Sequence, residues 1–202
     1  FIQCALPILS IDSPEGVDVW LLNDLDGNPG PTVVHGVHTF DDIAQYLARG
    51  KGYTPLIGTL RQVLSAYERF LTEEGVHIIV TTDGAPSDGG EAQLRALLSG
   101  RRLPHKSVVN FLVCTDRDEE VEYLNAIDMQ CANVDVVDDY NSEREQVLGK
   151  GVATTFTIGD YIVKAIIGGA DAEIDAADET PNPTVHRKTS KPDKPAPCCN
   201  IL

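Results

Sequence analysis

The hydrophobic residues of this chain gather in short runs that are separated by longer segments with helical spacing. Three runs are almost continuously apolar: Val76–Val80, Val108–Val113 and Val134–Val137. Such runs are typical of strands that are covered on both faces of a sheet. A fourth β-rich run, Val17–Leu22, follows a turn, and the Gly- and Pro-containing segment Asp24–Pro31 after it is predicted to be a loop.

Between these runs, apolar residues recur three or four positions apart, which predicts helices. The expected helices are Phe40 to about Arg49, capped by Thr39; a long helix from Leu56 that ends before Gly75; Glu91–Leu98; Asp118 to about Met129; a short helix begun by a capping box at Ser142; and Ile158–Ile167. Alternating strands and helices predict an α/β fold of the Rossmann-like, doubly wound type, with a mostly parallel sheet and helices on both faces.

The composition divides the 202 residues into one domain and a tail. After Gly168-Gly169 the chain becomes acidic and Ala-rich, and then rich in Pro, Lys and Thr, so residues 1–167 are predicted to fold and residues 168–202 to be disordered. A formal net charge of −15 argues against binding to nucleic acid. Five scattered cysteines without a C-x-x-C pair indicate buried free thiols in a reducing cytoplasm.

The best candidate site is Asp83, which follows the strand Val76–Val80. In open α/β sheets, ligands bind beyond the carboxyl ends of the strands. A carboxylate at that place suits Mg²⁺, although Asp-Gly also commonly begins a turn. The second candidate is Thr54, whose hydroxyl either caps the following helix or reaches a cation in the same crevice.

Two motifs together resemble the von Willebrand factor A (vWA) domain: Gly-Tyr-Thr-Pro at residues 52–55, and a strand ending in Thr-Thr-Asp-Gly at residues 81–84. The resemblance implies a metal-ion-dependent adhesion site in which Thr54 and Asp83 bind Mg²⁺ and a protein partner supplies a carboxylate. The D-x-S-x-S motif of the family is absent. The run from Phe1 to Ile11 reads as the helix that follows this motif, so the first, central strand is expected to be missing and the metal site incomplete.

Other polar residues are weaker candidates. Asp116 and Asp118 follow a strand end and either line the same crevice or favour a helix N-terminus. Asp138 and Asp139 form either an acid–base pair or a solvated turn. His77 is expected to be a hydrogen-bonded histidine within the sheet.

The last four residues, Cys-Asn-Ile-Leu, fit a C-a-a-X prenylation pattern. This pattern predicts a geranylgeranyl group on Cys199, with Cys198 as a possible palmitoylation site. One lipid chain gives marginal attachment, so a second lipid or the basic residues of the tail would be needed at the cytosolic face of a membrane.

Three functions are compatible with these features. The first is an intracellular, metal-dependent protein-binding module, tethered to a membrane. The second is a Mg²⁺-dependent hydrolase that uses Asp83. Enzymatic activity is not expected, because the chain has no P-loop, G-x-G-x-x-G, G-x-S-x-G or D-x-D-x-T motif. The third is a degenerate vWA domain with a scaffolding role.

Overall fold

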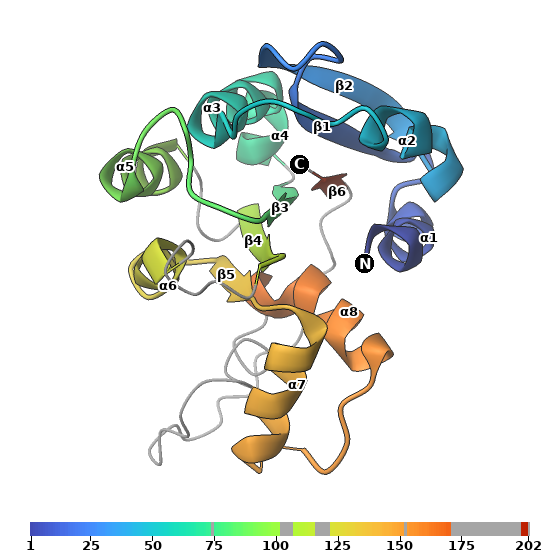
Figure 1. Ribbon diagram of the computed structural model, residues 1–202, viewed down its shortest axis with the longest axis vertical. Coiled ribbons are helices and arrows are strands. Elements are labelled where there is room, and N and C mark those ends of the chain that lie inside the picture. The colour runs from blue at the N-terminus through green and yellow to red at the C-terminus, as the bar shows by residue number, and fades with distance from the viewer. Residues whose placement is uncertain (74, 102–106, 116–121, 152, 171–198, 202) are drawn as a thin grey trace.

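The computed structural model describes residues 1–73, 75–101, 107–115, 122–151, 153–170 and 199–201 (Figure 1). The strands are β1 (Val17–Asn23), β2 (Pro29–Val37), β3 (Val76–Thr82), β4 (Ser107–Val113), β5 (Val134–Val137) and β6 (Cys199–Ile201). The helices are α1 (Ile2–Asp12), α2 (Phe40–Leu47), α3 (Leu56–Ala66), α4 (Glu68–Glu73), α5 (Glu91–Arg101), α6 (Glu122–Asp128), α7 (Tyr140–Gly149) and α8 (Ile158–Ile167), followed by the 3₁₀ turn η2 (Gly168–Ala170).

The strands form one six-stranded sheet in the order β2-β1-β6-β3-β4-β5. Strand β2 runs antiparallel to β1, whereas β1, β6, β3, β4 and β5 pair in parallel. The chain is therefore a mixed α/β protein with a parallel sheet flanked by helices, which is compatible with a Rossmann-like fold.

The sheet separates two hydrophobic cores, and neighbouring residues of one strand enter different cores. Ile78 packs in the core made with α3, α5 and α6, while Ile79 packs in the core made with α1, α7 and α8. Both are fully buried. This explains why β3 reads as a continuous apolar run: each of its side chains meets a helical layer, because helices cover both faces.

The predicted strands Val76–Val80, Val108–Val113 and Val134–Val137 are confirmed as β3, β4 and β5 to within two residues, and Phe1–Ile11 is confirmed as largely helical. The predicted long helix from Leu56 to Gly75 is wrong as one element, because α3 ends at Ala66 and α4 begins at Glu68. The short helix α7 begins at Tyr140 with Asp139 as its N-cap, so the predicted start at Ser142 is also wrong.

Two strands were not predicted. Strand β2 begins at Pro29, inside the predicted loop, and is an edge strand, where a proline and a glycine are tolerated. Strand β6 belongs to the segment predicted to be a disordered tail, yet it lies between β1 and β3. The turn η2, with Gly168 buried, also belongs to the folded part, while the remainder of the predicted tail, residues 171–198, lies outside the described residues.

Within the described ranges, no helix has the length and apolar character needed to cross a membrane.

Candidate functional site at the carboxyl edge of the sheet

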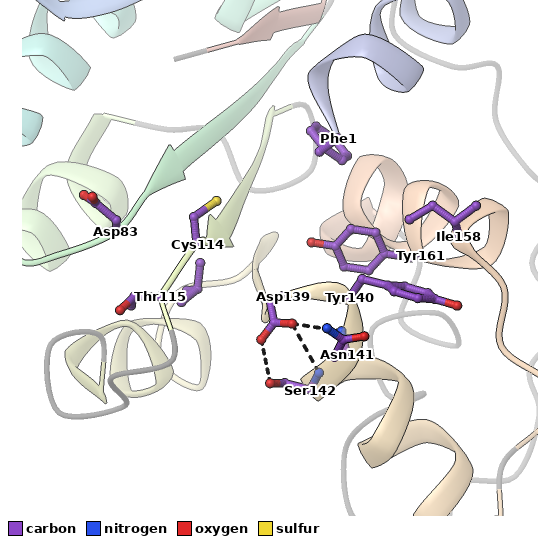
Figure 2. Close-up of a pocket in the computed structure, with 11 residues that line it drawn as sticks. Phe1, Asp83, Cys114, Thr115, Asp139, Tyr140, Asn141, Ser142, Ile158 and Tyr161 are labelled. Carbon is purple, nitrogen blue, oxygen red and sulfur yellow. Dashed lines mark hydrogen bonds between the residues drawn. The ribbon is translucent and has the colours of Figure 1, made fainter. Parts of the chain in front are cut away.

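Asp83 directly follows β3, at the edge where the parallel strands end. We call this side of the sheet the carboxyl edge. A cavity of about 860 Å³ opens there, as Figure 2 shows. Its lining comes from the ends of β3 and β4 and from the beginnings of α1, α7 and α8: Phe1, Asp83, Val113, Cys114, Thr115, Asp139, Tyr140, Asn141, Ser142, Ile158 and Tyr161.

The Asp83 carboxylate is exposed and takes part in no hydrogen bond or salt bridge with the residues that the structure describes. The hydrogen bonds that shape the following bend come instead from Thr82. Its Oγ1 lies 3.0 Å from the Gly84 carbonyl oxygen and 3.4 Å from the Gly84 nitrogen. A role for the Asp83 side chain in starting a turn is therefore not needed to explain the local backbone.

The second predicted residue, Thr54, is joined to the loop that follows Asp83. The Thr54 carbonyl accepts hydrogen bonds from the backbone nitrogens of Leu56 and Ser87, both at 2.8 Å. Its hydroxyl does not cap α3, because the N-cap position belongs to Pro55 and has no side-chain cap. The two predicted site segments are thus joined by a backbone hydrogen bond between Ser87 and Thr54. The side chains of Thr54 and Asp83 form no hydrogen bond with the described residues.

Asp88 performs the capping role that was considered for Thr54. Its carboxylate accepts hydrogen bonds from the backbone nitrogens of Ile57, at 3.1 Å, and Gly58, at 2.6 Å, so it satisfies two free donors at the start of α3. The approach is close: a Cβ atom on Gly89 would lie 2.6 Å from Cδ1 of Ile57. Asp88 was not singled out from the sequence, although a carboxylate followed by two glycines is a recognisable loop signal.

Asp139 lines the cavity, and both it and the preceding residue, Asp138, already take part in hydrogen bonds. Asp139 accepts hydrogen bonds from the Asn141 nitrogen at 2.9 Å and from Ser142 Oγ at 2.6 Å (Figure 2). The hydrogen bond from Ser142 lowers the pKa of Asp139. Asp138 accepts a hydrogen bond of 2.7 Å from Gln146 Nε2. The two carboxylates therefore hold the start of α7, which argues against an acid–base pair. Both residues are partly exposed in the connection between β5 and α7, so the alternative of a solvated turn is not contradicted.

Cys114 lines this cavity and is exposed, as is Cys4, so the prediction of buried thiols is wrong for these two residues and confirmed for Cys131. Partial desolvation of the Cys114 thiol raises its pKa, and the negative charge of Asp83 raises it further. The thiol consequently stays protonated at neutral pH and is not an activated nucleophile.

Tyrosine rings form the apolar wall of the cavity. The ring centroids of Tyr140 and Tyr161 are 5.7 Å apart in an edge-to-face arrangement. Both phenols donate hydrogen bonds to backbone carbonyls, Tyr161 to Asp138 at 3.0 Å and Tyr140 to Phe156 at 3.2 Å. Burial raises the pKa of Tyr161, so this ring system serves as a fixed surface rather than as an acid or base.

The oxygen donors of Thr54 and Asp83 are of the kind that Mg²⁺ prefers. Neither side chain makes a hydrogen bond or a salt bridge with a described residue, so both oxygen donors are chemically available to a cation. Asp83 is among the residues that line the cavity, whereas Thr54 is not. Within the described ranges, no group of three or more His, Cys, Asp or Glu side chains is placed to hold a metal. The weaker candidates Asp116 and Asp118 lie outside the described residues, as does Cys198, whereas Cys199 lies in β6.

A second set of charges lies deep in the protein and was missed by sequence reasoning. Lys164 Nζ lies 3.4 Å from Glu143 Oε1 and 3.8 Å from Asp135 Oδ1, and all three side chains are 2% exposed or less. We call these three residues the ion cluster. Gly168 packs so closely on it that a Cβ atom there would lie 1.9 Å from Asp135 Oδ2.

His77 differs from its expected role. Its Nε2 atom is buried and forms no hydrogen bond with a described residue, so the prediction of a hydrogen-bonded histidine is wrong for this atom. Burial lowers the pKa of His77 from 6.5 to about 4, which keeps the imidazole neutral at physiological pH.

Comparison with protein-family models, with curated proteins and with solved structures finds no match for this chain. The vWA resemblance therefore rests on sequence motifs, chiefly those at residues 52–55 and 81–84.

Proposed function

We propose that the chain is a vWA-type protein-binding domain whose carboxyl edge holds Mg²⁺ through Asp83 and Thr54. The observation that carries the proposal is the exposed Asp83 carboxylate, which has no structural partner among the described residues and borders a cavity of about 860 Å³. The hydrogen bond between Ser87 and Thr54 supports it by joining the two loops. Two protein oxygens leave room for a carboxylate of a protein partner to complete the metal shell.

Calorimetric titration with Mg²⁺ and Mn²⁺ tests this function. Asp83→Ala and Thr54→Ala are expected to weaken binding at least about tenfold, the size of effect given by loss of one interaction worth about 1.4 kcal/mol. Glu15→Gln is the matched control, because Glu15 is an exposed carboxylate near the opposite edge of the sheet, ahead of β1. Absence of metal binding in the unmodified protein would favour the degenerate, scaffolding domain instead.

A Mg²⁺-dependent hydrolase is the less supported alternative. A hydrolase needs an activated nucleophile or a general base near the metal. Here the Cys114 thiol is held protonated and Asp139 is engaged at the start of α7. Turnover of a generic phosphoester that is lost in Asp83→Ala would reverse this preference.

Membrane attachment through Cys199 is a separate proposal and rests on the C-a-a-X pattern alone. The structure places residues 199–201 of this pattern in β6, where the backbone of Cys199 pairs with that of His77. An unchanged membrane fraction after Cys199→Ser would refute the attachment.

A further inference from the structure

The central position of the sheet, between β1 and β3, is held by the shortest of the described strands. Strand β6 has three residues, whereas β1 and β3 have seven each. Strands in globular proteins most often have about five to six residues, so β6 is short for a strand that is paired on both sides.

Strand β6 fills only part of the space between its neighbours. Its pairs on β3 run from His77 to Ile79, and its pairs on β1 are Asp18 and Val19. Beyond these pairs, β3 continues for three residues to Thr82 and β1 for four residues to Asn23. Among the described residues, none pairs with these continuing segments on the side that faces β6. Unpaired strand edges are templates for a further strand.

The chemistry that this position accepts follows from its surroundings. Ile78 enters one hydrophobic core and Ile79 the other, so a strand beside them is covered by helices on both faces. Such a strand must be uncharged and mainly apolar. The sequence Cys-Asn-Ile of β6 meets this requirement.

The small extent of β6 also favours exchange. Its pairing comprises two residue pairs with β1 and three with β3. A segment that pairs along the whole of β1 and β3 would compete well with β6.

We propose that the space between β1 and β3 is an acceptor site for one parallel, uncharged β-strand, which residues 199–201 of the same chain occupy and from which they can be exchanged. This inference does not depend on a metal at Asp83, because it concerns the backbone edges of two strands. The strand-addition mode of peptide recognition provides the physical basis.

Hydrogen exchange on the full chain tests the occupant. Asn200→Pro removes a backbone donor from the middle of β6, while Asn200→Val keeps the strand. We expect those amides of residues 18–19 and 77–79 that point towards β6 to lose protection by about tenfold or more in Asn200→Pro and to keep it in Asn200→Val, whereas the alternate amides, which point towards β2 or β4, should change less. Unchanged protection in Asn200→Pro would overturn the proposal.

Peptide binding tests the exchange. A fluorescent peptide with the sequence of residues 195–202, kept reduced, is expected to bind Asn200→Pro at least about tenfold more tightly than the unmodified chain, because the tethered strand competes in the latter. The same peptide carrying Asn200→Pro is the control and should not bind.

If the Asn200→Pro protein does not fold, the unmodified chain is titrated instead with each of the two peptides at up to millimolar concentration. The exchange would be overturned if both peptides bound equally well or if neither peptide bound. A dimer in light scattering that dissociates on adding the peptide would show that a second copy supplies the strand, and would overturn occupancy from the same chain.

Discussion

The ion cluster and the carboxyl edge place carboxylates in opposite circumstances. Asp135 and Glu143 are almost fully buried and share one ammonium group, that of Lys164. Asp83 is exposed and has neither a salt bridge nor a hydrogen bond among the described residues. A buried charge must be compensated by its own fold, whereas an exposed one is free for a ligand. On this comparison, the ion cluster is expected to contribute to stability, and the carboxyl edge is the place where the proposed metal would bind.

The largest expected effect comes from breaking the ion cluster. Lys164→Met leaves two buried carboxylates without their cation and should lower the free energy of unfolding by about 3–5 kcal/mol. Urea denaturation measures the loss, and Lys51→Met, at an exposed lysine, is the control. A loss as small as in the control would mean that the cluster does not stabilise the fold.

The next effect is a pH dependence that originates at His77. Its pKa is about 4 in the folded protein and 6.5 ordinarily, so the unfolded chain takes up a proton first as the pH falls. Stability is therefore unaffected above about pH 7 and decreases as the pH falls from 6.5 towards 4, by about 2 kcal/mol at pH 5. His77→Gln should remove this slope, while His38→Gln, at an exposed histidine, should retain it. Identical slopes for the two variants would contradict the assignment to His77.

A smaller effect concerns the loop that joins the two parts of the carboxyl edge. Asp88→Ala removes two hydrogen bonds from the start of α3 and should cost about 1–2 kcal/mol, with Asp88→Asn costing less because its amide oxygen still accepts one. Asp88→Ala should also weaken Mn²⁺ binding, because the loop that contains Asp83 would be held less firmly beside Thr54. Thermal unfolding and calorimetry measure the two effects. A change no greater than that in Ser87→Ala would show that Asp88 does not organise this edge.

The smallest effect on stability is expected at Asp83 itself. Asp83→Ala removes no hydrogen bond or salt bridge among the described residues, so the free energy of unfolding should change by less than about 0.5 kcal/mol. Denaturant midpoints of Asp83→Ala and Lys164→Met, measured under the same conditions, compare the contribution of the two regions to stability directly. A large loss of unfolding free energy in Asp83→Ala would show that this carboxylate stabilises the fold, as the ion cluster is expected to do.

The sequence was most informative where one local pattern determines the structure. Strands β3 to β5 are covered on both faces, so their apolar runs predict them closely. Strand β6 has three residues and owes its place to pairing with residues more than 100 positions away, which leaves no local pattern to read. At α7 the sequence predicts a cap at Ser142, whereas Asp139 is the N-cap and accepts hydrogen bonds from the backbone nitrogens of Asn141 and Ser142.

The candidate site shows the same division. Asp83 and Thr54 could be proposed as candidate site residues from the end of a strand and from a motif, because both lie beside loops that are recognisable in the sequence. Lys164 could not, since a lysine in a helix is normally exposed and its partners come from β5 and α7. Asp88 and Cys114 also escaped notice, because their roles depend on how the loops at the carboxyl edge meet.

The most direct test of the central claim is to locate the metal by its paramagnetic effect. In the amide NMR spectrum of the full chain, substoichiometric Mn²⁺ should first broaden the signals of Thr54, Asp83 and Gly84, and Asp83→Ala should abolish this selectivity. With a net charge of −15, the surface also attracts cations weakly, so position is more informative than affinity alone. Broadening spread evenly over the acidic surface, and unchanged in Asp83→Ala, would contradict a metal site at the carboxyl edge.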